Sequence, residues 1–258
     1  MKTRLDVLLA ERGLAPSRTA AQALILEGKV RVDGQVETKA GRALPPEVEL
    51  SVESQPRFVS RGGEKLEGAF AAFPEWKVEG LACLDVGAST GGFTDCLLQH
   101  GARRVMAVDV GTNQLAYRLR TDPRVWVREN FNARSLTAAD LPERPDRAVA
   151  DVSFISLRLI LPPMAEVLLP GGEMVTLVKP QFEAGRGLAP GGVVVDPDVR
   201  SRVVEDITAF GENVLGLKRV GLVESPIRGR EKGNVEYLAY WRKTDGCLAG
   251  PDPAHGKE

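Results

Sequence analysis

Four ionisable residues that lie far apart in the sequence could together move a proton. Lys65, Asp151, Lys179 and Glu236 occur in the segments SRGGEKL, ADVSFISL, LVKPQFE and GNVEYLAY. A free lysine has a pKa of ~10.4, and burial beside a second cation can bring such a group to roughly 7–8, where it can act as a general base. We interpret the two lysines and two carboxylates as a catalytic site that removes or shares the proton of a poor nucleophile, such as a hydroxyl group.

Each of the four also has a purely structural interpretation. Lys65 falls off the apolar stripe of the helix expected over residues 64–73, and its position alone favours an ordinary solvated lysine. Asp151 could cap the next helix. Glu236 sits in a mostly apolar strand, where a buried acid needs a partner and could form a salt bridge with either lysine. Lys179 falls at the carboxyl end of an expected strand, where doubly wound folds place their sites.

A glycine-rich turn accompanies these residues. The apolar run 81–86 leads into a G-x-x-x-G-G turn at 87–92 and then into a helix. The turn has neither the dinucleotide-binding spacing nor the lysine of a phosphate loop. Asp109 ends the next strand, where an acid can bind both ribose hydroxyls of a nucleoside, and the helix start at Thr90–Thr94 suits a carboxylate. The combination indicates S-adenosylmethionine.

The surroundings of the turn favour a hydroxyl as the methyl acceptor. The segment Asp151–Phe154 stands where methylation of a base amine would use Asn-Pro-Pro-Tyr. Methylation at a pyrimidine C5 needs a nucleophilic cysteine, yet Cys83 adjoins a core strand, Cys96 lies inside a helix and Cys247 is in the tail. A ribose 2′-hydroxyl, activated by a lysine, fits better.

The pattern of apolar runs predicts an α/β fold. Strand-like runs alternate with helical patterns from residue 80 onward, which is typical of a mostly parallel sheet with helices on both faces. The last two runs are joined by a loop, which predicts a final antiparallel hairpin. The seven strands are expected at 81–86, 105–108, 125–127, 148–150, 174–178, 217–223 and 235–241.

The N-terminal segment predicts a small, separate unit. Residues 1–42 hold eight basic and five acidic residues, in a chain whose net charge is −1. Ser17 is a natural N-cap for a helix, and Asp33-Gly34 between short apolar runs predicts a tight hairpin. The pattern resembles the RNA-binding domain named after small-subunit ribosomal protein S-four. That resemblance implies that Arg4, Arg18, Lys29 and Arg31 contact RNA phosphates. The alternative is that they form only a solvated surface of a small domain.

Composition excludes several classes of protein. No apolar run approaches the ~18–20 residues that span a bilayer, and the first residues lack the features of a signal peptide. The three cysteines are unsuitably spaced for zinc, and reduced thiols in the cytoplasm are expected. With two histidines, His100 and His255, neither a Ser-His-Asp triad nor a histidine-rich metal site is expected; no metal is predicted.

Taken together, the motifs resemble the TlyA family of bacterial rRNA 2′-O-methyltransferases, historically called hemolysin A. The matching segments include VSRGGEKLEGA, LDVGASTGGFTD, ADVSFISL, LVKPQFEAGRG and GNVEYLAYW, and they span nearly the whole chain except the tail. The resemblance implies a Rossmann-like methyltransferase domain of the FtsJ type. It places the catalytic tetrad on Lys65, Asp151, Lys179 and Glu236. It places the cofactor contacts on Asp85, Gly87, Ala88, Ser89, Thr90, Gly91, Gly92, Phe93, Thr94, Asp109, Val110, Asn132 and Asp151.

The sequence therefore predicts a two-domain enzyme that acts on rRNA or ribosomal subunits. We expect an RNA-binding domain at 1–55, a linker at 56–63, a methyltransferase domain at 64–242 and a disordered tail at 243–258. The expected reaction is methylation of a ribose 2′-hydroxyl, of cytidine by family resemblance, in the large subunit and in some members the small one. A non-catalytic ribosome-binding factor, a membrane-active hemolysin and a pseudouridine synthase are the alternatives. The oligomeric state is left open.

Overall fold

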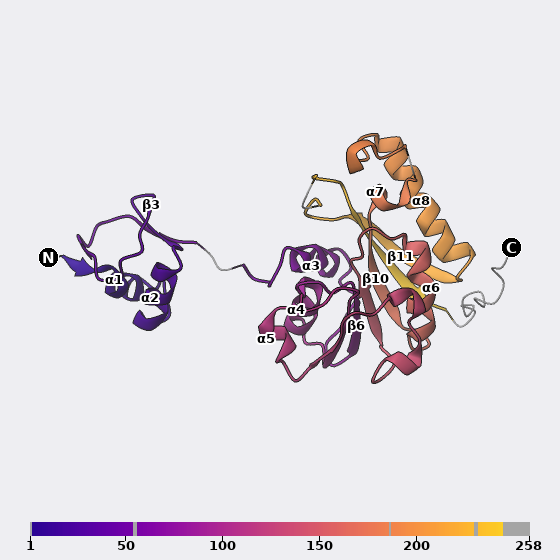
Figure 1. The fold of residues 1–258 in the computed structure, drawn as a ribbon, viewed down its shortest axis with the longest axis horizontal. Coiled ribbons are helices and arrows are strands. Elements are labelled where there is room, and N and C mark those ends of the chain that lie inside the picture. The colour runs from indigo at the N-terminus through magenta and orange to yellow at the C-terminus, as the bar shows by residue number, and fades with distance from the viewer. Residues whose placement is uncertain (1, 54–55, 186, 230–231, 245–258) are drawn as a thin grey trace. The chain divides into compact units, whose positions relative to one another are not determined.

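The computed structural model describes residues 2–53, 56–185, 187–229 and 232–244, and the chain divides into two compact units, Met1–Pro56 and Arg57–Glu258 (Figure 1). Cys247 and most of the predicted tail lie outside the described residues. We describe each unit by itself.

The first unit packs two helices and short strands around a small apolar core that includes Leu5, Leu9 and Ile25. Ser17 caps the second helix as predicted, because its side chain accepts a hydrogen bond from the backbone N–H of Ala20. The elements are β1 (Thr3–Arg4), α1 (Leu5–Glu11), α2 (Arg18–Leu26), β2 (Val30–Val32), β3 (Gln35–Val36), β4 (Ala43–Leu44) and β5 (Leu50–Val52).

The predicted hairpin joins β2 to β3. The two strands pair antiparallel, and the residues between them have φ angles of 49° at Asp33 and 78° at Gly34. Left-handed conformations at both central positions are those of a type I′ turn, whose twist matches that of paired strands. The Asp-Gly prediction is confirmed, and β5 completes a three-stranded sheet against β2.

The second unit is built on a seven-stranded sheet, in the order β11-β12-β10-β9-β6-β7-β8. All neighbouring strands pair parallel except those that involve β12, which is antiparallel to both β10 and β11. The predicted sheet and its closing antiparallel strand are confirmed. The strands are β6 (Ala82–Val86), β7 (Arg104–Val108), β8 (Val125–Arg128), β9 (Arg147–Ala150), β10 (Glu173–Val178), β11 (Leu217–Glu224) and β12 (Tyr237–Lys243).

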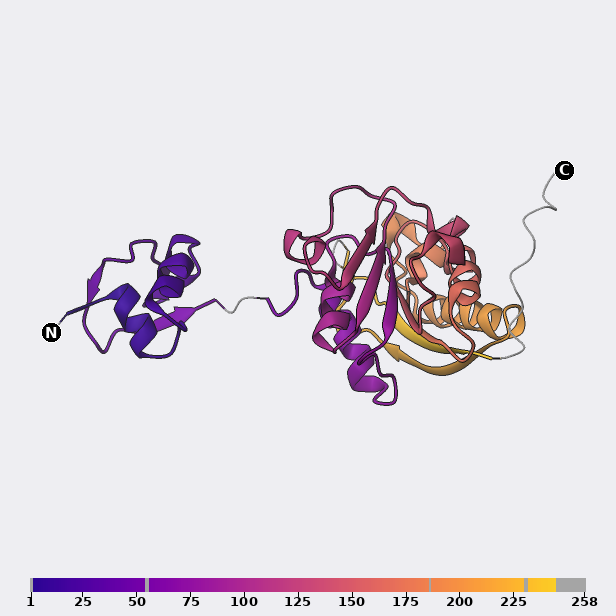
Figure 2. The same cartoon turned by 90° about the horizontal axis from the view of Figure 1, so that it is seen from below.

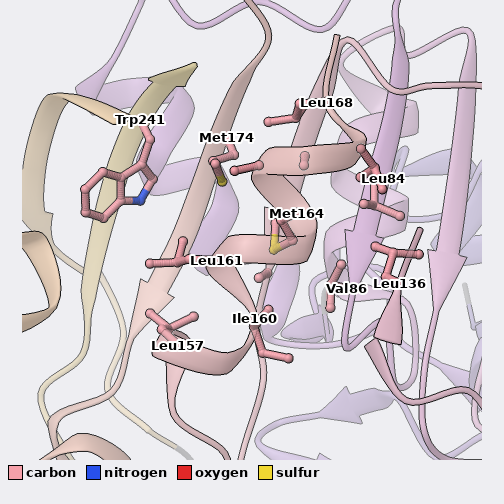
Figure 3. Close-up of a cluster of buried hydrophobic side chains, with 14 of the residues drawn as sticks. Leu84, Val86, Leu136, Leu157, Ile160, Leu161, Met164, Leu168, Met174 and Trp241 are labelled. Carbon is pink, nitrogen blue, oxygen red and sulfur yellow. The ribbon is translucent and has the colours of Figure 1, made fainter. Parts of the chain in front are cut away.

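Helices cover both faces of this sheet (Figures 1 and 2), and each face has its own core. Leu66 and Leu97 bring α3 and α4 onto one face. On the other face Met164, from α6, packs beside Leu84 and Met174 of the sheet (Figure 3). The helices are α3 (Gly62–Ala72), α4 (Gly92–Gln99), α5 (Tyr117–Arg120), α6 (Leu161–Val167), α7 (Pro180–Glu183) and α8 (Pro197–Asn213), with short 3₁₀ turns at η1 (Ala133–Ser135), η2 (Ala138–Asp140), η3 (Leu157–Leu159) and η4 (Pro190–Gly192).

The register of the parallel strands gathers the predicted site residues at one edge. Val86 of β6 pairs with Val108 of β7 and with Ala150 of β9. The residues that follow these strands, including Asp109 and Asp151, therefore leave the sheet at the same level. Lys179 leaves β10 at the same edge, because β10 is parallel to β9. Parallel strand ends are where this architecture forms ligand sites.

Two predicted boundaries need correction. Residues 56–63 are not a free linker: Phe58 is 4% exposed and packs in the α3–α4 core, the Val59 N–H is bonded to the Asp95 carboxylate, and α3 already starts at Gly62. A buried aromatic residue in a short polar stretch gave no periodic signal. At the other end β12 continues through Lys243, the first residue assigned to the tail.

Polar side-chain contacts of Glu67 also link α3 to Arg57 and to His100 at the end of α4, away from the edge that carries the predicted site residues. Glu67 accepts hydrogen bonds from Arg57 at 2.7 Å and pairs with His100 at 2.8 Å. His100 occupies the C-cap position of α4 and stacks on Phe70 with ring centroids 3.6 Å apart. Cys96 lies 3.7 Å from Glu67, and burial raises the pKa of its thiol. Glu67, Cys96 and His100 lie close enough together to resemble the ligands of a metal ion. We interpret their proximity instead as a packing contact that is supported by charge.

Candidate active site

A cavity of about 730 Å³ opens at the carboxyl edge of the sheet. Its wall contains all four tetrad residues together with much of the predicted cofactor turn. The predicted residues that line it are Lys65, Gly87, Ala88, Ser89, Thr90, Gly92, Phe93, Asp151, Lys179 and Glu236. Residues from five separate segments of the chain thus face one space.

Lys65 belongs to this site and is not a solvated surface residue. It is 8% exposed, and its Nζ donates a hydrogen bond of 2.6 Å to Glu236 Oε2. The same Nζ lies 3.7 Å from Asp151 Oδ2. Glu236 is 3% exposed and immediately precedes β12 rather than lying in it. The position of α3 over the strand edge buries a lysine that its helical pattern would leave in solvent.

Lys179 contacts the other oxygen of Asp151. Its Nζ lies 2.6 Å from Asp151 Oδ1, an ion pair without good hydrogen-bond alignment, and donates a hydrogen bond of 2.8 Å to Ser153 Oγ. Asp151 therefore lies between the two lysines. Of these two lysines, Glu236 pairs with Lys65. Asp151 does not act as a helix cap. With both lysines protonated and both carboxylates ionised, the group is neutral, which lowers the cost of burying it.

The glycine turn requires close backbone approach. Gly87 has a φ angle of +82°, and a Cβ there would lie 2.8 Å from the Asp151 carbonyl oxygen. A Cβ on Gly92 would lie 2.3 Å from Ser60 Oγ. Gly91 has a φ angle of +99°, and its missing side chain leaves room for Leu119 rather than for the cavity. Small residues are needed here to bring the turn against the tetrad and the start of α3.

Asp109 shapes the rim of the turn. Its carboxylate accepts hydrogen bonds from the backbone N–H of Ser89 at 2.7 Å and of Gly111 at 2.6 Å. The side chain is only partly buried, and a carboxylate has more acceptor positions than these two bonds use. The remaining lone pairs could accept the hydroxyls of a ribose.

Asp85 lies beneath the turn rather than in the cavity wall. It is fully buried, and Thr94 Oγ1 donates a hydrogen bond of 2.6 Å to its Oδ2. Burial raises the pKa of this carboxyl group to about 7, with a further contribution from the charge of Asp151. Its Oδ1 has no hydrogen-bond partner among the described residues. An unpaired buried oxygen under a glycine turn is compatible with a nearby cationic or N–H-bearing ligand.

Two more predicted cofactor residues lie outside the cavity wall, as Asp109 also does. Val110 is 73% exposed, and Asn132 caps the short turn η1 through a hydrogen bond from the backbone of Arg134. Neither belongs to the cavity wall. Both follow the Asp109 rim, because the N–H of Phe131 is bonded to the Asp109 carbonyl. Their contact with the cofactor stays a prediction, and it requires a ligand that extends past Asp109.

The cavity also has residues that sequence reasoning missed. Phe154 is 83% exposed, has a φ angle of +62°, and lies 5.0 Å from Phe182, centroid to centroid. A left-handed conformation is strained for an aromatic residue and tends to occur at functional sites. Gln181 donates a hydrogen bond to Glu236 at 3.4 Å. Ser153 and Phe154 could have been assigned to the site because they directly follow Asp151 in the sequence. The backbone strain at Phe154 could not be predicted from the sequence.

The predicted RNA-binding residues of the first unit are organised by an acid that was not predicted. Asp6 is fully buried, and its carboxylate accepts bonds from Arg4 at 3.0 Å, Arg18 at 2.9 Å and the Gln22 amide at 2.7 Å. The hydrogen bonds from Arg4 hold the pKa of Asp6 well below its usual range. Both arginine side chains are about half exposed, so each retains N–H groups that face solvent.

Lys29 and Arg31 are not part of that cluster. Lys29 pairs with Glu27 at 2.5 Å, and Arg31 donates a long hydrogen bond of 3.3 Å to the Gly34 carbonyl. Arg31 is exposed and Lys29 partly so. The four predicted residues therefore form two groups. Arg4 and Arg18 both bind the buried Asp6, whereas Lys29 and Arg31 belong to the hairpin region.

Comparison with known proteins decides the family. The sequence profile of FtsJ-like methyltransferases matches residues 58–243, which include the whole seven-stranded sheet and the four tetrad residues. The chain belongs to the FtsJ-like methyltransferase family. The S4 domain profile matches residues 3–50, so the predicted resemblance of the small unit is confirmed as well.

Individual relatives place this FtsJ-like methyltransferase in the predicted TlyA group. The 16S/23S rRNA (cytidine-2′-O)-methyltransferase TlyA of Mycobacterium tuberculosis is 47% identical over 252 residues, 96% of this chain and 93% of its own. The 23S rRNA (cytidine-2′-O)-methyltransferase TlyA of Campylobacter jejuni is 35% identical over 188 residues, 72% of this chain and 71% of its own. A solved structure from Streptococcus thermophilus, described as a hemolysin, matches with a TM-score of 0.72 and 46% identity over 95% of this chain and 89% of that one.

The word hemolysin raises the question of membrane insertion. Among the described residues, none of the helices is both long enough and apolar enough to cross a bilayer. The longest helix in the described part of the chain, α8, carries charged residues along its length.

Proposed function

We propose that this FtsJ-like methyltransferase transfers a methyl group from S-adenosylmethionine to the 2′-hydroxyl of a cytidine in large-subunit rRNA. The observation that carries the proposal is the convergence of Lys65, Asp151, Lys179 and Glu236 in one cavity beside the glycine turn. We choose cytidine as the base and the large subunit as the substrate because the names of both relatives include cytidine 2′-O-methylation of 23S rRNA. Methylation of small-subunit rRNA, named for one of them, is measured in the same experiment.

Residues around the turn fit the methyl donor. Asp109 offers free acceptor positions for ribose hydroxyls, the start of α4 offers backbone N–H groups for a carboxylate, and Asp85 provides a buried acceptor beneath the turn. When bound, S-adenosylmethionine supplies an electrophilic methyl group on a sulfonium. The exposed residues Val110 and Asn132 would complete the contacts beyond the rim.

The tetrad has a division of labour in this proposal. Lys179 takes or polarises the proton of the 2′-hydroxyl, since it faces the cavity and is oriented by both Asp151 and Ser153. Lys65, held by Glu236, positions the hydroxyl or stabilises the negative charge that develops on its oxygen. Asp151 and Glu236 hold the two lysine side chains in place. To accept the proton of the hydroxyl, Lys179 must first have released its own proton to solvent and be a neutral amine. Most of the acceleration comes from alignment in a site shielded from water.

The small unit supplies affinity for rRNA. Arg4 and Arg18 present guanidinium N–H groups to phosphates, with Lys29 and Arg31 as further contacts, and such contacts fix orientation without reading sequence. Because the substrate is ribosomal RNA, the proposed reaction belongs to the cytoplasm.

The decisive experiment uses the intact protein, S-adenosylmethionine with a labelled methyl group, and separate large and small ribosomal subunits from cells that lack the gene. Label should appear in 2′-O-methylcytidine of large-subunit rRNA, and nuclease mapping should give a single position. Label in a base, or none despite binding of the donor, would contradict the proposal, and the latter result would support a non-catalytic ribosome-binding factor.

A further inference from the structure

Two loops that flank the tetrad meet at one side chain. The first loop follows Lys179 and α7 and includes η4; the second lies between β11 and Glu236. Asn234, in the second loop, is 8% exposed. Its Nδ2 donates a hydrogen bond of 2.9 Å to the Gly192 carbonyl, and its Oδ1 accepts one of 3.3 Å from the Val194 N–H.

The orientation of this amide is determined by its partners. A backbone N–H needs an acceptor and a carbonyl needs a donor, so Val194 and Gly192 together allow only one placement of the Asn234 oxygen and nitrogen. Aspartate would lose the donor, and alanine would lose both bonds. Lys232 adds a contact between the same loops, because its Nζ bonds the Gly191 carbonyl.

The Asn234 contact lies close to Glu236 in space as well as in sequence. The Asn234 carbonyl accepts a hydrogen bond of 2.9 Å from the Gly229 N–H. A Cβ on Gly229 would lie 2.9 Å from Glu236 Oε1, so the Gly229 backbone packs against the catalytic carboxylate. Gly192, Gly229, Asn234 and Glu236 all line the cavity.

We propose that Asn234 is a positioning residue for methyl transfer. Its two hydrogen bonds join the loop that follows Lys179 to the loop that precedes Glu236. We infer that they thereby keep the distance between Lys179 and Glu236 constant. The inference rests on the proposed function for its kinetic consequence, but the tie between the loops is a property of the fold. Displacements of about 1 Å in catalytic geometry can cost on the order of 10²-fold in rate.

The test compares Asn234→Ala and Asn234→Asp with two control variants in the full-length protein. Thr208→Val removes a buried hydroxyl bond to the Glu205 carbonyl in α8, outside the cavity wall, and controls for lost stability. Asn213→Ala changes an exposed asparagine at the end of α8. We expect kcat on rRNA to fall roughly 10- to 100-fold for Asn234→Ala, while KM for rRNA and Kd for S-adenosylmethionine change less than about twofold, and both controls to keep wild-type kcat.

Backbone hydrogen exchange gives a readout that needs no activity. Exchange at Val194 should accelerate in Asn234→Ala and stay at the wild-type rate in Thr208→Val. If Val194 exchange is unchanged, or if Asn234→Ala keeps its kcat while the wild type is active, the inference is wrong. An inactive wild type with accelerated Val194 exchange in Asn234→Ala would instead count against the proposed function and leave the loop tie supported.

Discussion

Lys65 Nζ donates a hydrogen bond of 2.6 Å to Glu236 Oε2, across 171 residues of sequence. Both side chains are almost fully buried, 10% and 3% exposed. A buried ion pair is costly to break by removing one partner, because the other charge is left desolvated. The pair therefore links the stability of the domain to the geometry of the site.

This link predicts that substitutions at the pair are not additive in stability. Lys65→Met should destabilise the protein by about 3–5 kcal/mol, and Glu236→Gln in the same protein should recover part of that loss. Chemical denaturation of the two single variants and the double variant measures the coupling, with the exposed Lys218→Met as control. Strict additivity would show that the two residues do not act as a pair in solution.

A second prediction concerns the donor. Asp109→Ala should weaken S-adenosylmethionine binding by ~1–3 kcal/mol, the cost of lost hydrogen bonds to an ionised acceptor. Asp109 also holds the Ser89 and Gly111 N–H groups, so Asp109→Asn, which keeps an acceptor, should lose less. Calorimetry gives both affinities. Unchanged affinity for both variants would move the ribose contact away from this rim.

The third prediction concerns the buried carboxyl group beneath the turn. Burial raises the pKa of Asp85 from 3.8 to about 7, so between these values the folded protein holds a proton that the unfolded chain releases. The contribution of Asp85 to stability must then fall as pH rises from about 4 to about 7, by on the order of 4 kcal/mol. Asp85→Asn should remove this slope and be more stable than wild type at pH 8. Parallel stability curves for the two proteins from pH 5 to 8 would contradict it.

A fourth prediction concerns the arginine pair of the small unit. Arg4→Ala and Arg18→Ala should each weaken rRNA binding and reduce the salt dependence of affinity by about one phosphate contact, with unchanged donor affinity. Asp6→Asn should weaken rRNA binding in wild type but add little once both arginines are gone, since Asp6 acts through them. Titrations at several salt concentrations measure this, with exposed Lys77→Ala as control. Equal salt slopes for all variants would exclude the pair from the RNA contact.

Much of the site could be predicted because strand ends in a parallel sheet meet at one edge. Asp109, Asp151 and Lys179 each directly follow a strand, so their proximity follows from the alternating pattern once the strand order is known. Lys65 and Glu236 could be assigned only through the family motif. Lys65 is off the apolar stripe of α3, and its burial depends on how that helix sits over the sheet edge.

The remainder depends on tertiary contacts that leave no periodic signal. Asp6 looks like a surface acid of a short helix, yet four hydrogen bonds from side chains of β1 and α2 hold it in the core. The left-handed backbone of Phe154 and the loop contacts of Asn234 likewise arise from long-range packing. Phe58 was assigned to a linker because an isolated aromatic residue does not reveal which core it enters.

The most direct test of the account is the methyl-transfer rate of Lys179→Ala on large ribosomal subunits, at saturating S-adenosylmethionine in single turnover. We expect a loss of ~10²–10⁴-fold, the usual value of a positioned general base, with donor and rRNA affinities near wild type and Lys218→Ala fully active. A Lys179→Ala enzyme that keeps most of its turnover would contradict the assignment of Lys179 and leave Lys65 as the next candidate base.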